Sequence, residues 1–178
     1  MRFLLSAALL AALALPALAD EPRDGSHDFD FNLGHWHTHI KRLSKPLSGS
    51  ADFIELDGTI TVDKIFDTGG SIDHLVADGP GRHFEGSTLF LYNPEAHQWS
   101  QTFVGRKDGV LQPSTVGSFK DGRGALYGQD TLNGRTILVR DEFFDIEADR
   151  HRFEESYSAD GGKSWEVVFS AQLTRLKS

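Results

Sequence analysis

The sequence predicts an all-β protein of roughly ten strands, arranged as an antiparallel up-and-down β-barrel. Turn signals recur at short spacing, the segments between them are apolar or alternate in polarity, and helical periodicity is almost absent. We expect strands over residues 36–43, 53–66, 71–76, 84–92, 98–104, 116–120, 125–131, 136–146, 152–158 and 165–176. No linker, internal repeat or second domain is visible, so residues 28–178 should form a single barrel domain.

The first strand is introduced by an aromatic and acidic segment, residues 28–33, and by Gly34-His35-Trp36. Small antiparallel barrels often begin this way, with a glycine that lets the chain turn inward and a tryptophan that fills one end. We therefore expect the first strand to pair with the last one and to close the barrel.

Residues 1–19 have the composition of a secretory signal peptide. Arg2 supplies the positive charge, residues 3–15 form an apolar core too short to span a bilayer, and Ala17-Leu18-Ala19 is a small-residue cleavage site. Cleavage would leave 159 residues (178 minus 19), in which residues 20–27 form a flexible leader. We expect a soluble periplasmic or secreted protein.

Composition excludes several classes of site and partner. The chain has no cysteine, so disulfides, thiolate metal sites and a cysteine nucleophile are absent. Loss of Arg2 with the signal peptide changes the net charge from -8 to -9. An acidic chain without a basic cluster repels phosphate backbones, so we expect neither nucleic acid nor membrane insertion. The oligomeric state stays open.

The C-terminal hairpins can be aligned from their turns. Asn133-Gly134 is a two-residue hairpin signal that places Leu126 opposite Asp141. A loop centred on Ala148 pairs Phe143 with Phe153, and the turn at 159–162 should bring Tyr157 near Trp165. The face expected to point inward carries Leu126, Gly128, Ile137, Val139, Phe143, Phe153, Tyr157, Trp165, Val167, Phe169, Ala171 and Leu173.

Two acids, Asp141 and Glu155, fall side by side on this apolar face. Facing carboxylates in a dry interior cannot both ionise cheaply, so at least one pKa should rise unless a cation or ligand compensates. Arg42, on the same face as Trp36, is the candidate cation. Asp141 and Glu155 are therefore candidate catalytic residues. A one-residue slip would instead expose Asp141 and pair Glu142 with Glu155.

Two further motifs invite a functional interpretation. His35, His37 and His39 share one face of the first strand and are weak metal-ligand candidates. They should point outward if Trp36 points inward, and a solvated strand face is the favoured interpretation. Residues 158–165, S-A-D-G-G-K-S-W, fit an Asp-box, a motif that shapes a hairpin turn in sialidase propellers; one copy indicates a turn.

The order of several short motifs carries a resemblance to a known group. D-F-x-F-x-x-G-x-W, Y-N-P-x-x-x-Q-W-S, D-G-V-L-x-P, D-G-R-G-x-x-Y-G-x-D and S-A-D-G-G-K-S-W follow one another between residues 28 and 176. The sequence thereby resembles an exported bacterial family of calycin-like (lipocalin-related) β-barrels of unknown function. This resemblance implies a calycin-like barrel with a central pocket and brings no catalytic residue. Haem-binding members of the broader group use a late histidine, but none follows His151, so we expect no cofactor.

The preferred functional interpretation is a binding barrel for a small apolar or aromatic molecule in an aromatic-lined interior. A barrel of this size can equally be solid, with the same aromatic residues as filler. The alternatives are an isomerase, cyclase or hydrolase that uses the carboxylate pair, and an envelope interaction protein that uses the outer surface. The candidate ligand-binding residues are Trp36, Thr38, Arg42, Trp99, Gln101, Phe103, Asp141, Glu155, Tyr157, Trp165 and Phe169.

Overall fold

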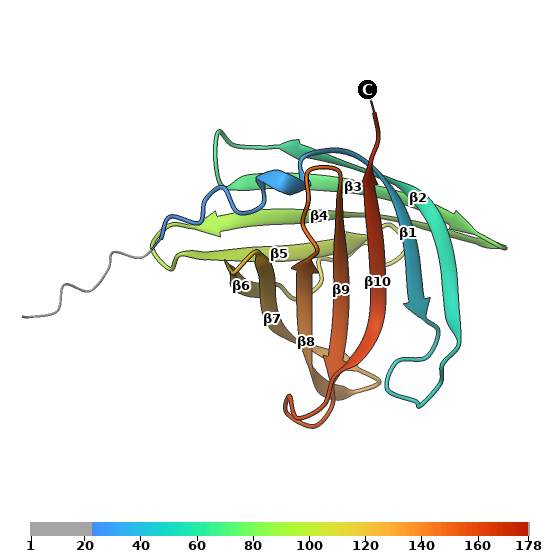
Figure 1. The fold of residues 1–178 in the computed structure, drawn as a ribbon. Coiled ribbons are helices and arrows are strands. Elements are labelled where there is room, and N and C mark those ends of the chain that lie inside the picture. Colours follow the sequence, from blue (N-terminus) through green and yellow to red (C-terminus); the bar gives the residue numbers. More distant parts are fainter. Residues whose placement is uncertain (1–22, 178) are drawn as a thin grey trace, which may run out of the picture.

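The structure is a computed structural model in which residues 23–177 are described, and it forms a closed antiparallel barrel of ten strands (Figure 1). The strands are β1 (Gly34–Leu43), β2 (Phe53–Lys64), β3 (Gly70–Gly79), β4 (Arg82–Asn93), β5 (Gln98–Gly105), β6 (Thr115–Lys120), β7 (Arg123–Leu132), β8 (Arg135–Phe144), β9 (Arg150–Ser158) and β10 (Glu166–Arg175). Neighbours in the sequence pair in order, and β1 pairs with β10 to close the sheet. The expected fold class and closure are confirmed. The expected signal peptide lies outside the described residues.

A short segment plugs the end of the barrel at which β1 begins and β10 finishes (Figure 1). It contains a 3-10 helix, η1 (Asp30–Asn32), and the buried ring of Phe29, which lies 4.9 Å from the rings of Trp99 and Phe143. Gly34 then turns the chain into β1 with a positive φ of 106°, a conformation that glycine adopts without strain. We call this half of the barrel the closed end.

The segment before η1 is held to the closed end rather than free. The backbone N–H of Gly25 donates to the hydroxyl of Tyr92 at 3.0 Å, and Trp99 Nε1 donates to the carbonyl of Gly25 at 2.8 Å. Within residues 23–27, expected as part of a flexible leader, Gly25 is thus tied to the closed end by two hydrogen bonds. The two aromatic rings supply the donor and the acceptor that fix the chain.

Trp36 lies at the centre of the closed end and is fully buried. Its indole N–H donates to the carbonyl of Asn32 at 2.8 Å, and the guanidinium of Arg175 lies 4.0 Å from its ring centroid. Arg175 also donates to the carbonyls of Leu33, at 2.8 Å, and Phe31, at 3.0 Å. One side chain of β10 therefore clasps the plug to the barrel through a cation–π contact and backbone hydrogen bonds.

The expected register of the C-terminal hairpins is confirmed up to β9. Leu126 pairs with Asp141, Phe143 with Phe153, and Asp141 with Glu155. The next hairpin is different, because a bulge between Val167 and Phe169 shifts the pairing and places Glu166 opposite Tyr157. An inserted residue reverses which side chains face inward.

The bulge corrects two expectations for β10 and its approach. Val168 is buried and faces the interior, whereas Val167 is 37% exposed. Trp165 lies against the outer face of the barrel, with the guanidinium of Arg140 4.7 Å from its ring centroid and the ring of Tyr127 at 6.3 Å. Trp165 and Val167 were expected inside, which is wrong.

The Asp-box forms a hairpin turn, as expected. Asp160 Oδ1 accepts the backbone N–H groups of Lys163 and Ser164, both at 3.0 Å, and the hydroxyl of Ser158 at 2.8 Å. Hydrogen bonds from the side chain and backbone of Ser164 are the largest of the effects that lower the pKa of Asp160 to about 2. The motif shapes the connection between β9 and β10.

Candidate functional site

The half of the barrel opposite the closed end is hollow. A cavity of about 1120 Å³ opens between the loops at this end and reaches down to Asn32 and His151 on the closed end. Its volume slightly exceeds the usual range of ligand pockets, about 300–1,000 Å³. The barrel is therefore solid at the closed end, where aromatic side chains fill it, and hollow in the other half.

One wall of the cavity is apolar and aromatic. Phe84 stacks on Phe103 with ring centroids 6.0 Å apart, and Phe169 lies 6.3 Å from Phe84 and 6.0 Å from Phe153. Gly86 makes room for this band, because a Cβ atom there would lie 2.5 Å from the Phe103 ring. Aliphatic side chains of β1, β2 and β3 continue the wall: Ile40, Ile54, Leu56, Ile60 and Leu75.

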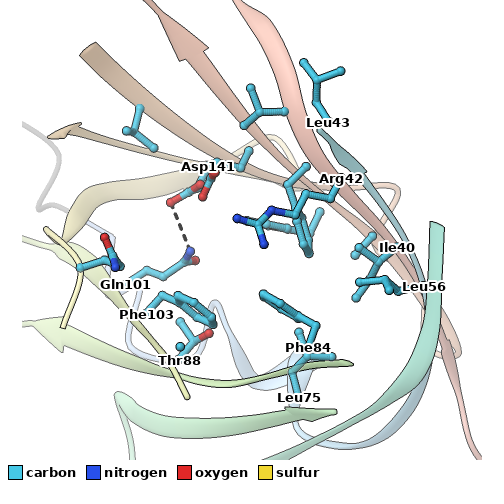
Figure 2. Close-up of a pocket in the computed structure, with 18 of the residues that line it drawn as sticks. Ile40, Arg42, Leu43, Leu56, Leu75, Phe84, Thr88, Gln101, Phe103 and Asp141 are labelled. Atoms are coloured by element: carbon cyan, nitrogen blue, oxygen red, sulfur yellow. Dashed lines mark hydrogen bonds between the residues drawn. The ribbon is translucent and has the colours of Figure 1, made fainter. Parts of the chain in front are cut away.

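The facing wall contains the carboxyl pair that the register predicts. Asp141 is 2% exposed, and its Oδ2 accepts the hydroxyl of Thr115 at 2.7 Å and the amide N–H of Gln101 at 3.2 Å (Figure 2). Asp141 Oδ1 and Gln101 Oε1 are buried and have no hydrogen-bond partner among the residues that the structure describes. Glu155 is the cross-strand partner of Asp141 on β9.

Burial governs the electrostatics of this pair. Loss of hydration raises the pKa of Asp141 well above its ordinary value, and the negative charge of Glu155 adds to the effect. Burial also raises the pKa of Glu155, against the opposing effects of the Tyr157 hydroxyl and the Arg42 charge. A buried acid that keeps its proton next to a second carboxyl can donate or accept a proton, or can anchor a polar ligand group.

Arg42 lies at the mouth of the cavity on β1. Figure 2 shows its guanidinium pointing into the pocket between Asp141 and Phe84, and it lies 5.6 Å from the Phe84 ring centroid. Within residues 23–177 it forms no salt bridge. Its charge therefore acts on the acid pair from a distance and does not neutralise it directly.

Seven of the candidate ligand-binding residues line this cavity: Arg42, Gln101, Phe103, Asp141, Glu155, Tyr157 and Phe169. The other four lie elsewhere. Trp36 and Trp99 are packed into the closed end, Thr38 is fully buried in β1 outside the cavity lining, and Trp165 lies on the outer face. Trp36 and Trp99 pack against the plug, and Trp165 packs beside the turn between β9 and β10, because their large rings complete packed clusters.

Sequence reasoning missed several residues of the interior. Phe84 and Thr115 line the cavity, and alternation along their strands was the available signal. Asp73 is a third interior acid, whose Oδ1 accepts the backbone N–H of Thr88 at 2.6 Å. Burial raises its pKa to about 7, although the Thr88 hydrogen bonds oppose that rise. Asp73 falls on the same face of β3 as Ser71, Leu75 and Ala77, so side-chain alternation along the strand could have predicted that it points inward.

The structure places His151 at the base of the cavity. It is 2% exposed, and its ring lies edge-on to Trp36 at 4.6 Å and to Phe31 at 5.0 Å. Burial and the charge of Arg175 lower its pKa to about 4. His151 is therefore neutral at physiological pH.

The histidines of β1 lie on the outer surface, as the favoured interpretation expected. Acids face them from β2, which the sequence did not reveal: His39 Nδ1 lies 3.0 Å from an oxygen of Asp57, and His37 lies 3.8 Å from the same atom. Lys41 pairs with Glu55 at 2.9 Å. In the part of the chain that is described, no group of three or more His, Asp or Glu side chains is arranged to hold a metal ion.

Comparison with known proteins yields a structural likeness and no family. No family model and no curated protein match the chain. Among solved structures, the barrel is similar to the S-type phycobiliprotein lyase CPES from Guillardia theta, with a TM-score of 0.58 and 12% sequence identity over 85% of this chain and 92% of that chain. At this identity the likeness concerns the fold alone. The chain is a closed ten-stranded antiparallel barrel with a calycin-like structural neighbour.

Proposed function

We propose that this protein is an exported binding protein that holds a small, partly apolar molecule inside its barrel. The observation that carries the proposal is the open cavity of about 1120 Å³, with an aromatic wall facing a wall of buried polar groups. Aromatic surface supplies contact area, and a few convergent polar groups fix orientation. Export rests on the sequence of residues 1–19 and on the resemblance to exported bacterial barrels.

The architecture of the neighbour supports this choice. A phycobiliprotein lyase uses the same type of barrel. Within residues 23–177, no helix has the length and apolar character needed to cross a membrane. A carrier that works outside the cytoplasm would present its open end to solvent and keep its closed end packed.

A neutral fluorescent hydrophobe, N-phenylnaphthylamine, tests whether the cavity binds ligands. Val139 is 8% exposed and lines the cavity, so Val139→Trp would fill part of it. We expect the wild type to bind the probe and Val139→Trp to bind it at least about tenfold more weakly, because the indole occupies its space. Titration by fluorescence measures both affinities.

Val167→Trp is the matched control, since it places the same indole on the outer face of β10. It should bind the probe as the wild type does. Absence of binding to the wild type, or equal binding to both variants, would contradict the proposal. Native mass spectrometry of protein purified from its own cells, compared with the denatured mass, then gives the mass of the natural ligand.

Acid–base catalysis on the bound molecule is a second candidate function. One observation favours it: Asp141 Oδ1, which has no hydrogen-bond partner within residues 23–177, belongs to a carboxyl with a raised pKa next to Glu155. Conversion of the identified ligand by the wild type and not by Asp141→Asn would support an isomerase, cyclase or hydrolase. A ligand recovered unchanged after long incubation would leave binding as the function.

A further inference from the structure

We propose that the cavity selects ligands with a cationic N–H group, such as a protonated amine or amidine, which sits between Asp141 and Glu155. The inference rests on the proposed binding function and specifies the chemistry of the ligand. It follows from three features of the site: the balance of donors and acceptors, the balance of charge, and the aromatic wall.

Among the hydrogen-bonded groups around Asp141, acceptors outnumber donors. The hydroxyl of Thr115 and one amide N–H of Gln101 are both spent on Asp141 Oδ2. Asp141 Oδ1 and Gln101 Oε1 are left without partners in the described part of the chain, although both atoms are buried. A buried acceptor without a donor costs free energy. A ligand that donates N–H groups to these two oxygens would remove that cost.

The charge balance points the same way. Asp141 and Glu155 face each other on β8 and β9, and Asp130 of β7 lines the same cavity. Arg42, the cation whose charge acts on Glu155, is exposed at the mouth and lies over Phe84, where Arg82, Arg106 and Lys107 also line the cavity. A cationic ligand group would offset the repulsion between the carboxylates and make charge-assisted hydrogen bonds, whereas a carboxylate ligand would meet a third negative charge.

The aromatic wall suits the same ligand class. Phe84, Phe103 and Phe169 form a continuous band opposite the acids, so an amine attached to an apolar body would place the body on the rings. Their π-faces also attract a cation that passes close to them. The site thus matches an amphiphilic amine with its charged end toward β8 and β9.

A matched series of fluorescent ligands tests the selection directly. Pyrenebutylamine, pyrenebutanol and pyrenebutyric acid share one apolar body and differ only in the terminal group. We expect the amine to bind the wild type at least about tenfold more tightly than the alcohol, and the acid to bind most weakly. The double variant Asp141→Asn, Glu155→Gln should abolish the preference for the amine over the alcohol.

Glu154→Gln is the control for lost charge, because Glu154 is the residue next to Glu155 but points outward toward Arg152, 3.1 Å away. It should keep the amine preference. Equal affinities for the amine and the alcohol in the wild type would overturn the inference and leave the binding function intact. Binding of none of the three compounds would overturn both.

Calorimetry provides a second readout that fold damage cannot mimic. The pair is surrounded by Arg42 from β1, Asp130 from β7 and Tyr157 from β9. Because burial raises the pKa of both carboxyls, binding of the cation should favour their ionised forms and release protons over the pH range in which the unliganded pair is still protonated, and the heat should then depend on the buffer. The wild type should show this release with the amine and not with the alcohol. An amine that binds without proton release would contradict its placement at the pair.

Discussion

The buried carboxyl of Asp141 contributes to the candidate site but lowers the stability of the folded protein when it ionises. Burial raises its pKa in the folded protein above the ordinary value of 3.8. Between these two pKa values the folded state binds more protons than the unfolded state, so the free energy of unfolding falls as the pH rises. The contribution is favourable at low pH and is lost once the folded-state pKa is passed.

Asp141→Asn should therefore stabilise the unliganded protein by roughly 1 to 3 kcal/mol at pH 8, because a neutral amide avoids burying a charge. The gain should disappear near pH 4, where the native side chain keeps its proton. Urea denaturation over a pH series measures both values, with Glu154→Gln as the reference. A variant that is less stable than the wild type at pH 8 would show that the burial argument is wrong.

His151 should produce the opposite pH dependence. Its pKa falls from 6.5 to about 4 in the folded protein, so the unfolded state binds more protons within that window. Stability contributed by the neutral ring is present above pH 6.5 and is lost as the pH falls, amounting to about 3 kcal/mol by pH 4. His151→Leu should flatten this part of the stability profile.

The exposed His35 provides the control, since its side chain lies on the outer face of β1, contacts the Thr61 hydroxyl and pairs with no acid in the described residues, so His35→Gln should not flatten the profile. Comparison of slopes between pH 6.5 and 4 is insensitive to any uniform loss of stability in the variants. Identical slopes in His151→Leu and the wild type would contradict the assignment.

At the scale of elements, β10 determines both ends of the barrel. Its bulge at Val167–Phe169 turns Trp165 and Val167 outward and Val168 inward, which shapes the open end. Its last residue, Arg175, clasps the plug through Trp36 and two carbonyls. β10 therefore carries the bulge that alters the open end and the arginine that holds the plug at the closed end.

Arg175→Gln should cost about 2 to 4 kcal/mol of unfolding free energy, because it removes the cation–π contact and leaves two partly buried carbonyls without donors. The plug should also become sensitive to limited proteolysis before η1. Arg150→Gln, which removes only an exposed ion pair with Glu147, should leave the free energy of unfolding close to that of the wild type. Similar losses in the two variants would mean that the clasp contributes nothing specific.

For the molecule as a whole, one half of the barrel interior is a packed core that stabilises the fold, and the other half is a cavity. The closed end holds Phe29, Phe90, Trp99, Leu126 and Phe143 in one packed cluster. A second cluster around Trp36 runs along β1, β2 and β3. Burial of these rings supplies the favourable free energy that lets the other half keep a cavity and buried acids.

Turn residues and side-chain alternation in the sequence predicted the strands, their antiparallel order and the facing of Asp141 and Glu155. These features depend on local rules: turn residues fix the length of each hairpin, and side chains alternate between faces along a strand. The hairpin signal at Asn133-Gly134 and the loop around Ala148 were sufficient to bring the two acids together.

Contacts between residues far apart in the chain determine which half of the barrel is hollow and which aromatic residues line it. Trp99 and Trp165 have similar local patterns, yet one completes the plug and the other lies on the outer face. The choice depends on the bulge in β10 and on how the segment before β1 folds back, and both are set by contacts between residues far apart in the chain. Pairing rules are local, whereas the filling of a closed space is a property of all ten strands together.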